Sequence, residues 1–251
     1  MFSIFRERFR QGYRTNPFPK KEPVLSERFR GLPQLNQAKC KSGCHDCEKC
    51  CPTGAISRQG DKMVLDLGRC LFCADCKGCP HGAVTFSTDY RLAVNNRDDL
   101  HYGGETLALA KALEKKTLAL FGRSLKLRQV SAGGCNACEA DVNVLGTLVF
   151  DLGRFGIQFV ASPRHADGLL VTGPVSENMR AALLTTWEAT PAPKIVIASG
   201  ACAITGGPFI NSPEINNGLD DILPVDLYVP GCPPSPYTIL DGLLRILDKR
   251  G

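Results

Sequence analysis

The feature that most constrains this chain is the placement of four cysteines directly after short apolar runs. They are Cys135 and Cys138 after 125–130, Cys202 after 194–199, and Cys232 after 226–229. Such runs read as strands of a parallel sheet, whose following loops all open at its carboxyl edge, where these folds place their ligands. Four thiols that are far apart in sequence can therefore converge on one point. Four converging thiolates suit an iron–sulfur cube or a zinc ion.

The pattern around these cysteines predicts a doubly wound α/β domain. Further strands are expected at 157–161 and 168–172, and helices at 138–151, 176–188 and 235–248. Near-continuous apolar runs such as 168–172 fit strands that are covered on both faces. We therefore expect a flavodoxin-like parallel sheet over 125–251.

The other nine cysteines lie in an internal repeat between residues 34 and 90. One run begins at Cys40 and the other at Cys70, and both end in Cys-Pro-x-Gly-Ala followed by Ile or Val. A short strand is expected at 63–66 between them. This spacing is typical of metal ligands rather than of a disulfide scaffold. A reducing compartment keeps such thiols free, so we expect a cytoplasmic protein.

The repeat resembles the bacterial two-cluster ferredoxin, an α+β fold. In that family three cysteines of one run and the Cys before Pro of the other bind each [4Fe–4S] cluster. The resemblance implies one ligand set of Cys40, Cys44, Cys47 and Cys79 and a second set of Cys70, Cys73, Cys76 and Cys51. Two gaps depart from the family spacing, because three residues follow Cys40 before Cys44 and two follow Cys76 before Cys79. Cys50 is an extra thiol that the repeat leaves outside both sets.

The C-terminal half carries a dense set of further motifs. They are Cys135–Glu139, Arg154–Ile157, Ala161–Asp167, Leu169–Gly173, Gly200–Cys202 and Val229–Pro236. This half resembles the small subunit of energy-converting [NiFe] hydrogenases, such as formate hydrogenlyase, and the 20-kDa subunit of respiratory complex I. The resemblance implies that Cys135, Cys138, Cys202 and Cys232 hold a third [4Fe–4S] cluster that faces a large partner subunit. Glu139 and Arg164 are candidates for tuning that cluster or coupling protons to it, although Glu139 equally suits the first turn of a helix.

The N-terminal segment holds the charge excess of the chain. Residues 1–30 contain eight Lys and Arg against three Glu, an excess equal to the net charge of +5 for all 251 residues. Phe2, Phe5, Phe9 and Tyr13 recur at helical spacing among arginines, which predicts an amphipathic helix over 1–13. Such a helix lies in a membrane interface, docks on a partner or packs on its own domain. Four prolines between 15 and 33 predict an extended arm rather than packed structure.

The expected organisation has four parts: the arm at 1–33, a ferredoxin domain at 34–90, a connector at 91–124 with a helix over 106–121, and the hydrogenase-small-subunit-like domain at 125–251. No run of about 18 apolar residues occurs, so no transmembrane helix is expected. The chain thus resembles a fusion of two neighbouring electron-transfer subunits with three [4Fe–4S] clusters.

The resemblance implies an electron-transfer subunit of a membrane-associated, [NiFe]-hydrogenase-like or complex-I-like oxidoreductase, non-catalytic alone. Its partners would be a hydrogenase-like or complex I 49-kDa-like large subunit and membrane subunits, at the inner face of the cell membrane. A basic arm on a near-neutral body does not indicate a nucleic-acid partner. Two alternatives remain open. One is the same chain in a nickel-free, quinone- or ferredoxin-linked complex, and the other is a zinc-binding scaffold without a redox role.

Overall fold

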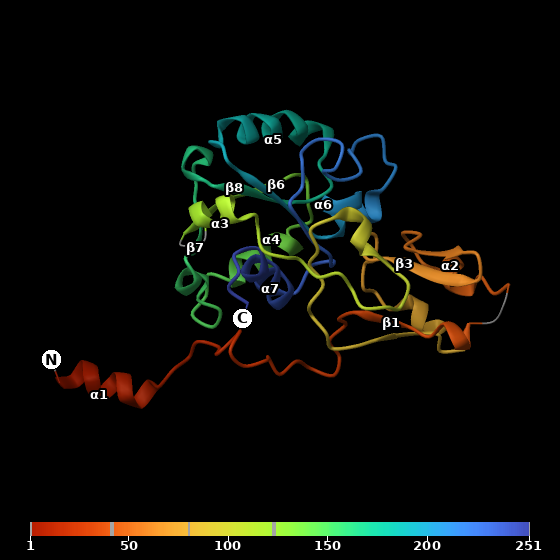
Figure 1. Ribbon diagram of the computed structural model, residues 1–251, viewed down its shortest axis with the longest axis horizontal. Coiled ribbons are helices and arrows are strands. Elements are labelled where there is room, and N and C mark those ends of the chain that lie inside the picture. The colour runs from red at the N-terminus through yellow and green to blue at the C-terminus, as the bar shows by residue number, and fades with distance from the viewer. Residues whose placement is uncertain (1, 41–42, 80, 122–123, 251) are drawn as a thin grey trace.

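The computed structural model describes residues 2–40, 43–79, 81–121 and 124–250. Five parallel strands form one sheet in the C-terminal half (Figure 1). They are β6 (Leu125–Ser131), β7 (Ile157–Phe159), β8 (Gly168–Thr172), β9 (Ile195–Ser199) and β10 (Leu227–Val229). Their spatial order, β10-β9-β8-β6-β7, is the order of a flavodoxin-like doubly wound sheet. The prediction of a parallel sheet in this half is confirmed.

Both faces of the sheet are buried, because alternate residues of the central strands enter different apolar clusters. In β8, Leu169 and Val171 belong to one cluster, whereas Leu170 belongs to the other. Helices α4 (Ala137–Val144) and α7 (Pro236–Ile246) cover one face, and α5 (Glu177–Ala189) covers the other (Figure 1). The helix predicted at 138–151 is too long, because i→i+3 hydrogen bonds from Leu145 and Gly146 end α4 in a tight turn.

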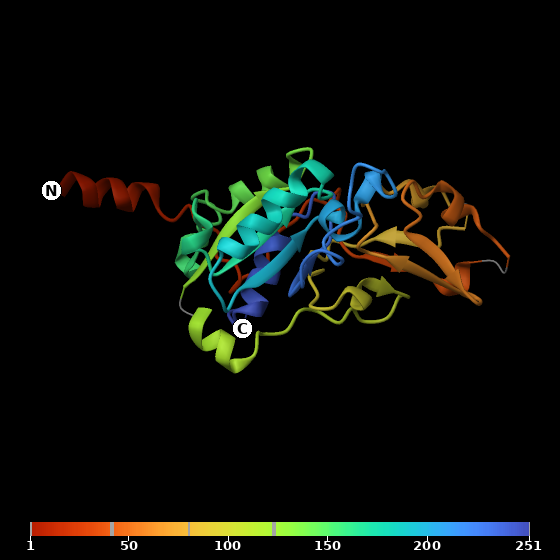
Figure 2. The ribbon, with the colours of Figure 1, turned by 90° about the horizontal axis from the view of Figure 1, so that it is seen from above.

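The two cysteine runs lie in a small unit, residues 33–102, at the opposite end of the molecule from the N-terminus (Figure 2). Its elements are β1 (Pro33–Leu35), α2 (Asp46–Cys50), β2 (Ile56–Gln59), β3 (Lys62–Asp66), β4 (Val84–Phe86) and β5 (His101–Tyr102). β1 pairs with β4, and β3 pairs with both β2 and β5, all antiparallel. The strand expected at 63–66 lies within β3.

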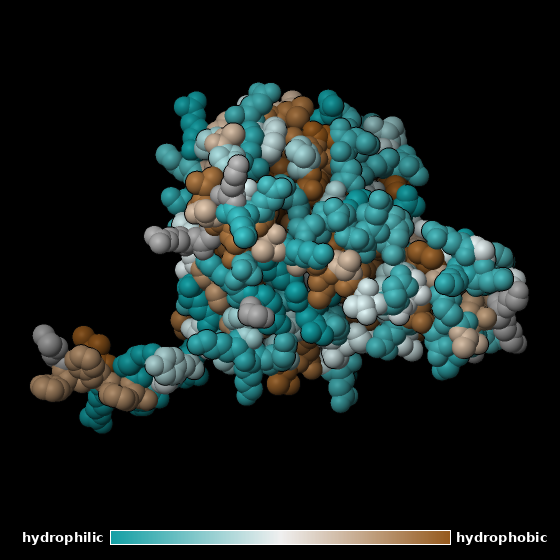
Figure 3. Space-filling model, viewed as in Figure 1, coloured by the Kyte–Doolittle hydropathy of each residue, from teal (hydrophilic) through white to brown (hydrophobic). Residues whose placement is uncertain are grey.

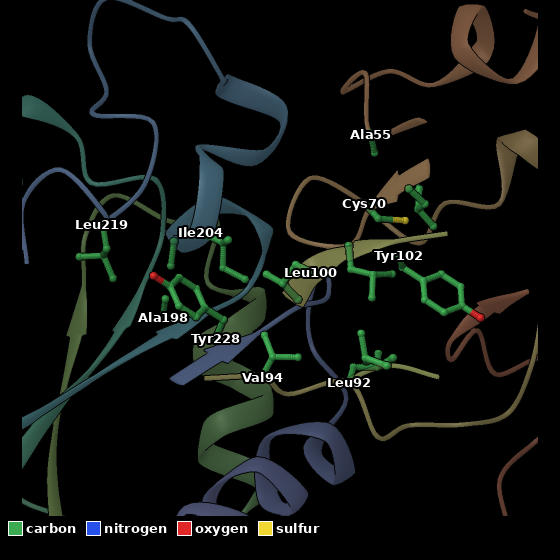
Figure 4. Packing of buried hydrophobic residues seen from close by; sticks show 14 of the residues in the cluster. Ala55, Cys70, Leu92, Val94, Leu100, Tyr102, Ala198, Ile204, Leu219 and Tyr228 are labelled. Carbon is green, nitrogen blue, oxygen red and sulfur yellow. The ribbon is translucent and has the colours of Figure 1, made fainter. Parts of the chain in front are cut away.

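One apolar cluster runs from the small unit into the parallel sheet (Figure 4). Leu100 and Cys70 of the small unit share this cluster with Ala198 and Ile204 of the sheet domain. Val94, in the segment expected to be a connector, also exchanges backbone hydrogen bonds with Tyr228 of β10. The small unit is therefore packed onto one end of the sheet through a common core.

The helix predicted over 106–121 is wrong in its first half. Only α3 (Lys115–Phe121) is helical, and residues 106–114 before it form neither helix nor strand. Ala110 donates its backbone N–H to Ala93, and Leu113 donates to Ile246. These long-range hydrogen bonds satisfy the backbone where the sequence pattern suggested helical ones.

The N-terminal arm is extended, but the expectation that it is unpacked is wrong. Phe18 is only 2% exposed, and its ring makes edge contacts with Tyr90 and Tyr237 at centroid distances of 5.8 and 5.6 Å. The guanidinium of Arg250 lies 4.9 Å from the centre of the same ring. One large aromatic residue thus finds an apolar socket that local sequence cannot reveal.

Helix α1 (Phe2–Gln11) precedes this arm and projects away from the body (Figures 1 and 2). None of its residues is buried, and Phe2 and Phe9 are 91% and 86% exposed. The alternative that this helix packs on its own domain is therefore wrong. Figure 3 shows apolar side chains gathered on the projecting helix beside polar ones.

Candidate metal centres

Three groups of cysteines gather in the structure, and the first lies at the carboxyl edge of the parallel sheet. We call it the edge site, and its members are Cys135 after β6, Cys138 in the first turn of α4, Cys202 on α6 (Ala201–Thr205) after β9, and Cys232 after β10. Strand order reverses between β6 and β8, and doubly wound folds bind ligands at this switch point.

The four thiols of the edge site are within electrostatic reach of one another. Burial, followed by the influence of Cys232 and Cys135, raises the pKa of Cys202 to about 12. Burial also raises the pKa of Cys138, and the other three thiols and Glu139 add to that rise. The pKa of Cys232 is raised by burial and then by Cys135. Binding of a metal must therefore displace protons from the thiols of Cys138, Cys202 and Cys232, which ties metal affinity to pH.

Two glycines leave the edge-site sulfurs unobstructed. Gly200, which turns the chain from β9 into α6, has a φ of +95°, and a Cβ at this position would lie 2.6 Å from Cys138 Sγ. Gly207 has a φ of +55°, and a Cβ there would lie 2.9 Å from Cys202 Sγ. The bare backbone at both positions, together with an all-sulfur donor set, fits a metal–sulfur group.

Glu139 lies buried behind the edge site. Its Oε1 accepts hydrogen bonds of 2.6 Å from the hydroxyls of Ser131 and of Thr172. Burial alone raises the pKa of this carboxyl, but the two hydroxyl bonds outweigh it and hold the pKa below its ordinary value. The structure therefore places a fixed negative charge beside the thiols.

Arg164, the other candidate tuning residue, is placed differently. It is exposed on the short 3-10 turn Pro163–His165, which follows β7 at the margin of the sheet. Within the described part of the chain, no hydrogen bond or ion pair joins Arg164 to the four thiols of the edge site.

The second group lines a cavity in the small unit, which we call the inner cavity. Its lining includes Cys51, Cys70, Cys73 and Cys76, one complete set implied by the ferredoxin resemblance. Burial is the main cause that raises the pKa of Cys70 to about 12 and that of Cys76 to about 11. The backbone N–H groups of Ala55 and Phe72 donate to Cys51 Sγ and Cys70 Sγ at 3.2 and 3.4 Å.

The third group lines the outer cavity, which shares Ile56 of β2 with the lining of the inner cavity. Its lining includes Cys40, Cys44, Cys47 and Cys79, the remaining implied set. Burial, then a hydrogen bond with Cys79, raises the pKa of Cys47 to about 12. Backbone N–H groups, first that of Ala83, lower the pKa of Cys79. Cys50 lines neither cavity and is exposed.

A single ion holds its ligands closer together than a cube does. Among the residues that the structure describes, no three His, Cys, Asp or Glu side chains gather as one metal ion would require. Zinc binds thiolates at about 2.3 Å, so four of them are drawn tightly around it. A cube of four irons holds the same four thiolates farther apart. A metal count distinguishes a zinc ion from an iron–sulfur cube.

Comparison with known proteins places the sheet domain. Residues 135–246 match the family described as NADH ubiquinone oxidoreductase, 20 Kd subunit. The probable membrane-bound hydrogenase subunit mbhJ of Pyrococcus furiosus is 47% identical over 142 residues, which cover 55% of this chain and 85% of the relative. The chain belongs to the 20 Kd subunit family. All four cysteines of the edge site lie within the matched residues, whereas both cavities lie outside them.

Relatives within the 20 Kd subunit family come from two kinds of complex. Formate hydrogenlyase subunit 7 of Escherichia coli is 44% identical over 143 residues, covering 57% of this chain and 55% of the relative. A subunit of the NADH-quinone oxidoreductase of Geotalea daltonii is 45% identical over 118 residues, covering 47% of this chain and 69% of the relative. The chain thus spans about half the length of its Escherichia coli relative. No helix in the described ranges is long and apolar enough to cross a bilayer.

Two arginines near the cavities escaped sequence reasoning. Arg58 on β2 donates from Nη1 to Cys40 Sγ at 3.3 Å and to the carbonyl of Cys44 at 3.0 Å. Arg30 of the arm donates to the carbonyls of Phe72 and Cys73 at 3.0 and 2.5 Å. The sequence shows basic residues near the cysteine runs. It does not show which of these arginines contacts a sulfur atom.

Proposed function

We propose that this chain is an iron–sulfur electron-transfer subunit of a membrane-associated oxidoreductase of the hydrogenase or complex I type. The observation that carries the proposal is the gathering of Cys135, Cys138, Cys202 and Cys232 at the switch point of a sheet that belongs to the 20 Kd subunit family. Members of this family bind one [4Fe–4S] cluster. These four thiolates are the residues that would hold it.

Such a cluster, when bound, would supply one-electron transfer at a potential set by burial, hydrogen bonds and nearby charge. The chain contributes the holding thiols, the bare backbone of Gly200 and Gly207, and the fixed carboxylate of Glu139. These groups bind and tune a redox centre, and chemistry on a substrate belongs to a partner subunit. We therefore assign the chain a relay role and no catalysis of its own.

The two cavities support a relay of three clusters. The four cysteines in each lining suit one [4Fe–4S] cluster per cavity, as in a two-cluster ferredoxin. Cys47 of the outer cavity is within electrostatic reach of Cys76 of the inner cavity, and Cys73 of the inner cavity reaches Cys232 of the edge site. The order outer cavity, inner cavity, edge site follows from these neighbours. On this proposal the small unit is a fused ferredoxin domain.

The partners and the location follow from the relatives and from α1. The names of the two hydrogenase relatives and of the quinone oxidoreductase relative point to a hydrogenase-like or 49-kDa-like large subunit beside the edge site, and to membrane subunits. Helix α1 offers exposed aromatic side chains among arginines, a combination suited to a membrane interface. We place the chain at the cytoplasmic face of the cell membrane.

A second candidate is the same relay in a nickel-free complex that serves quinone or ferredoxin. The similarity to the quinone oxidoreductase relative favours it, because that protein is 45% identical, close to the value for the hydrogenlyase relative. The large subunit purified with this chain decides between the two candidates. Nickel bound in that subunit supports the hydrogenase type, and its absence supports the quinone or ferredoxin type.

The test of the relay is an iron and zinc count on the anaerobically purified chain, with EPR of the dithionite-reduced protein. We expect about twelve irons from three clusters of four. Cys202→Ala should remove about four irons and the signal of the edge site, while the control Cys50→Ala keeps all of them. Zinc in place of iron would refute the relay, and loss of every signal in Cys202→Ala would refute the division into separate sites.

A further inference from the structure

We infer that Arg58 raises the reduction potential of the cluster in the outer cavity and keeps it above that of the cluster in the inner cavity. The inference rests on the proposed function, because it requires an iron–sulfur cluster in each cavity. It concerns which of the two clusters has the higher reduction potential, a difference that the spacing of the cysteines does not show.

The guanidinium of Arg58 is held against the wall of the outer cavity by three contacts. Nη1 donates to Cys40 Sγ at 3.3 Å and to the carbonyl of Cys44 at 3.0 Å. Nη2 donates to the carbonyl of Asp61 at 3.0 Å, across the turn between β2 and β3. Arg58 is half-buried, and its backbone is paired with Met63 of β3. A planar donor fixed on a paired strand keeps its direction toward the sulfur.

The direction of the effect follows from charge. One electron added to a bound cube adds one negative charge, spread over the cube and its thiolates, and no bond forms or breaks. Arginine stays protonated in proteins, so its positive charge is present at every working pH. A charge-assisted hydrogen bond to sulfur therefore stabilises the reduced state more than the oxidised state. Partial burial of Arg58 limits the screening of this charge by solvent.

The inner cavity has no equivalent of this contact among the residues that the structure describes. Its sulfurs receive neutral backbone donors, from Ala55 to Cys51 and from Phe72 to Cys70. Arg30, on the arm beside this cavity, is exposed and donates to backbone carbonyls rather than to sulfur. Among the charged side chains that the structure describes, which do not include that of Lys77, Arg58 is the one that hydrogen-bonds a thiol of either cavity.

One carboxylate lies beside each cavity. Glu48 lines the outer cavity and is hydrogen-bonded to the His45 ring. Asp75 lines the inner cavity, is exposed, and has no ion-pair partner among the described residues. A carboxylate beside each cavity disfavours an added electron at both, so the contact of Arg58 with Cys40 Sγ makes the inner cluster the harder of the two to reduce. Electrons would then rest at the outer cluster and pass the inner one by an uphill step.

The experiment is an EPR-monitored redox titration of the full chain, in which Cys44→Ala and Cys73→Ala assign the outer and inner signals. In the wild-type chain we expect the outer cluster to be reduced first. Arg58→Gln should lower the outer potential and leave the other two unchanged, and Arg58→Lys, which keeps the charge without the fork, should lower it less. Lys62→Gln removes a positive charge from the exposed side of the same hairpin and should change nothing.

Three results would overturn the inference: an unshifted outer potential in Arg58→Gln, an equal shift in Lys62→Gln, or reduction of the inner cluster first in the wild-type chain. The last measurement decides the matter even where Arg58→Gln fails to retain its cluster. A chain without iron would instead refute the proposed function. A chain with all its irons and unshifted potentials would refute this inference alone.

Discussion

Replacing Gly200 by alanine tests whether the edge site is built as described. Gly200 has a φ of +95° and a ψ of 154°, a combination that residues with a side chain rarely adopt. Backbone strain of this kind costs about 1 to 3 kcal/mol. The added Cβ would also lie 2.6 Å from Cys138 Sγ, closer than any ordinary contact. Overpacking of a tight site adds about 1 to 3 kcal/mol.

The two costs together amount to about 2 to 6 kcal/mol. At roughly 1.4 kcal/mol per factor of ten, even the lower end weakens retention of a cluster by about 30-fold. The clash is relieved when the Cys138 sulfur moves away from Gly200 or when the turn between β9 and α6 opens. Either movement separates Cys138 from Cys202. We therefore expect Gly200→Ala to lose about four of about twelve irons and the EPR signal of the edge site.

The matched control is Gly60→Ala in the turn between β2 and β3. Gly60 also has a positive φ, +63°, but a Cβ there meets no atom within 4 Å. This variant carries a strain of about 1 to 2 kcal/mol without a clash, and it should keep all its irons. Iron counts, EPR and thermal unfolding are measured on both variants. Full iron content and an unchanged edge-site signal in Gly200→Ala would refute the role of the bare backbone at this position.

Three further predictions concern the arm and the N-terminal helix. Phe18→Ala should lower the free energy of unfolding by about 3 to 5 kcal/mol in denaturant titrations, because the Phe18 ring is buried. The control Val24→Ala, at an exposed position, should change it by less than about 0.5 kcal/mol. Equal effects of the two substitutions would contradict the burial of Phe18. Deletion of residues 2–13 should release the complex from membranes or weaken its assembly, with all irons retained. Membrane flotation measures the first effect, and size-exclusion chromatography measures the second. Unchanged behaviour in both assays would contradict a docking role for α1. A hydrogen bond from Tyr90 and pairing with Arg250 hold the pKa of Glu22 below its ordinary value of 4.5. Ionised Glu22 therefore stabilises the folded chain at pH values above 4.5, and this stabilisation is lost as the pH falls through the folded-state pKa. Glu22→Gln should therefore be less stable than the wild type at neutral pH, by under about 1 kcal/mol for so exposed a pair, and the difference should vanish in acid; a difference that persists in acid would contradict the assignment.

Local patterns of the sequence determined the parallel sheet and the positions of the cysteines in its loops. Neighbouring residues of β8 point to opposite faces of the sheet, so that Leu169 enters one apolar cluster and Leu170 the other. A strand that is buried on both faces therefore needs an uninterrupted apolar run, and such a run is visible in the sequence. The convergence of Cys135 and Cys202 follows from the same rule, because loops after parallel strands share one edge. The grouping of cysteines in the two cavities follows the internal repeat in the same way, although their metal content stays a prediction.

The tertiary structure alone decided the contacts between segments far apart in the chain. Three features depend on surfaces that exist only after the sheet has formed. They are the packing of Phe18 between Tyr90 and Tyr237, the long-range hydrogen bonds of the residues before α3, and the contact of Arg58 with Cys40. The approach of Cys73 to Cys232 likewise depends on the core shared by the small unit and the sheet. The periodicity of apolar residues shows which face of a helix or strand is buried. It does not show which other element packs against that face, and the packing of the small unit on the sheet sets the distances between the three cysteine sites.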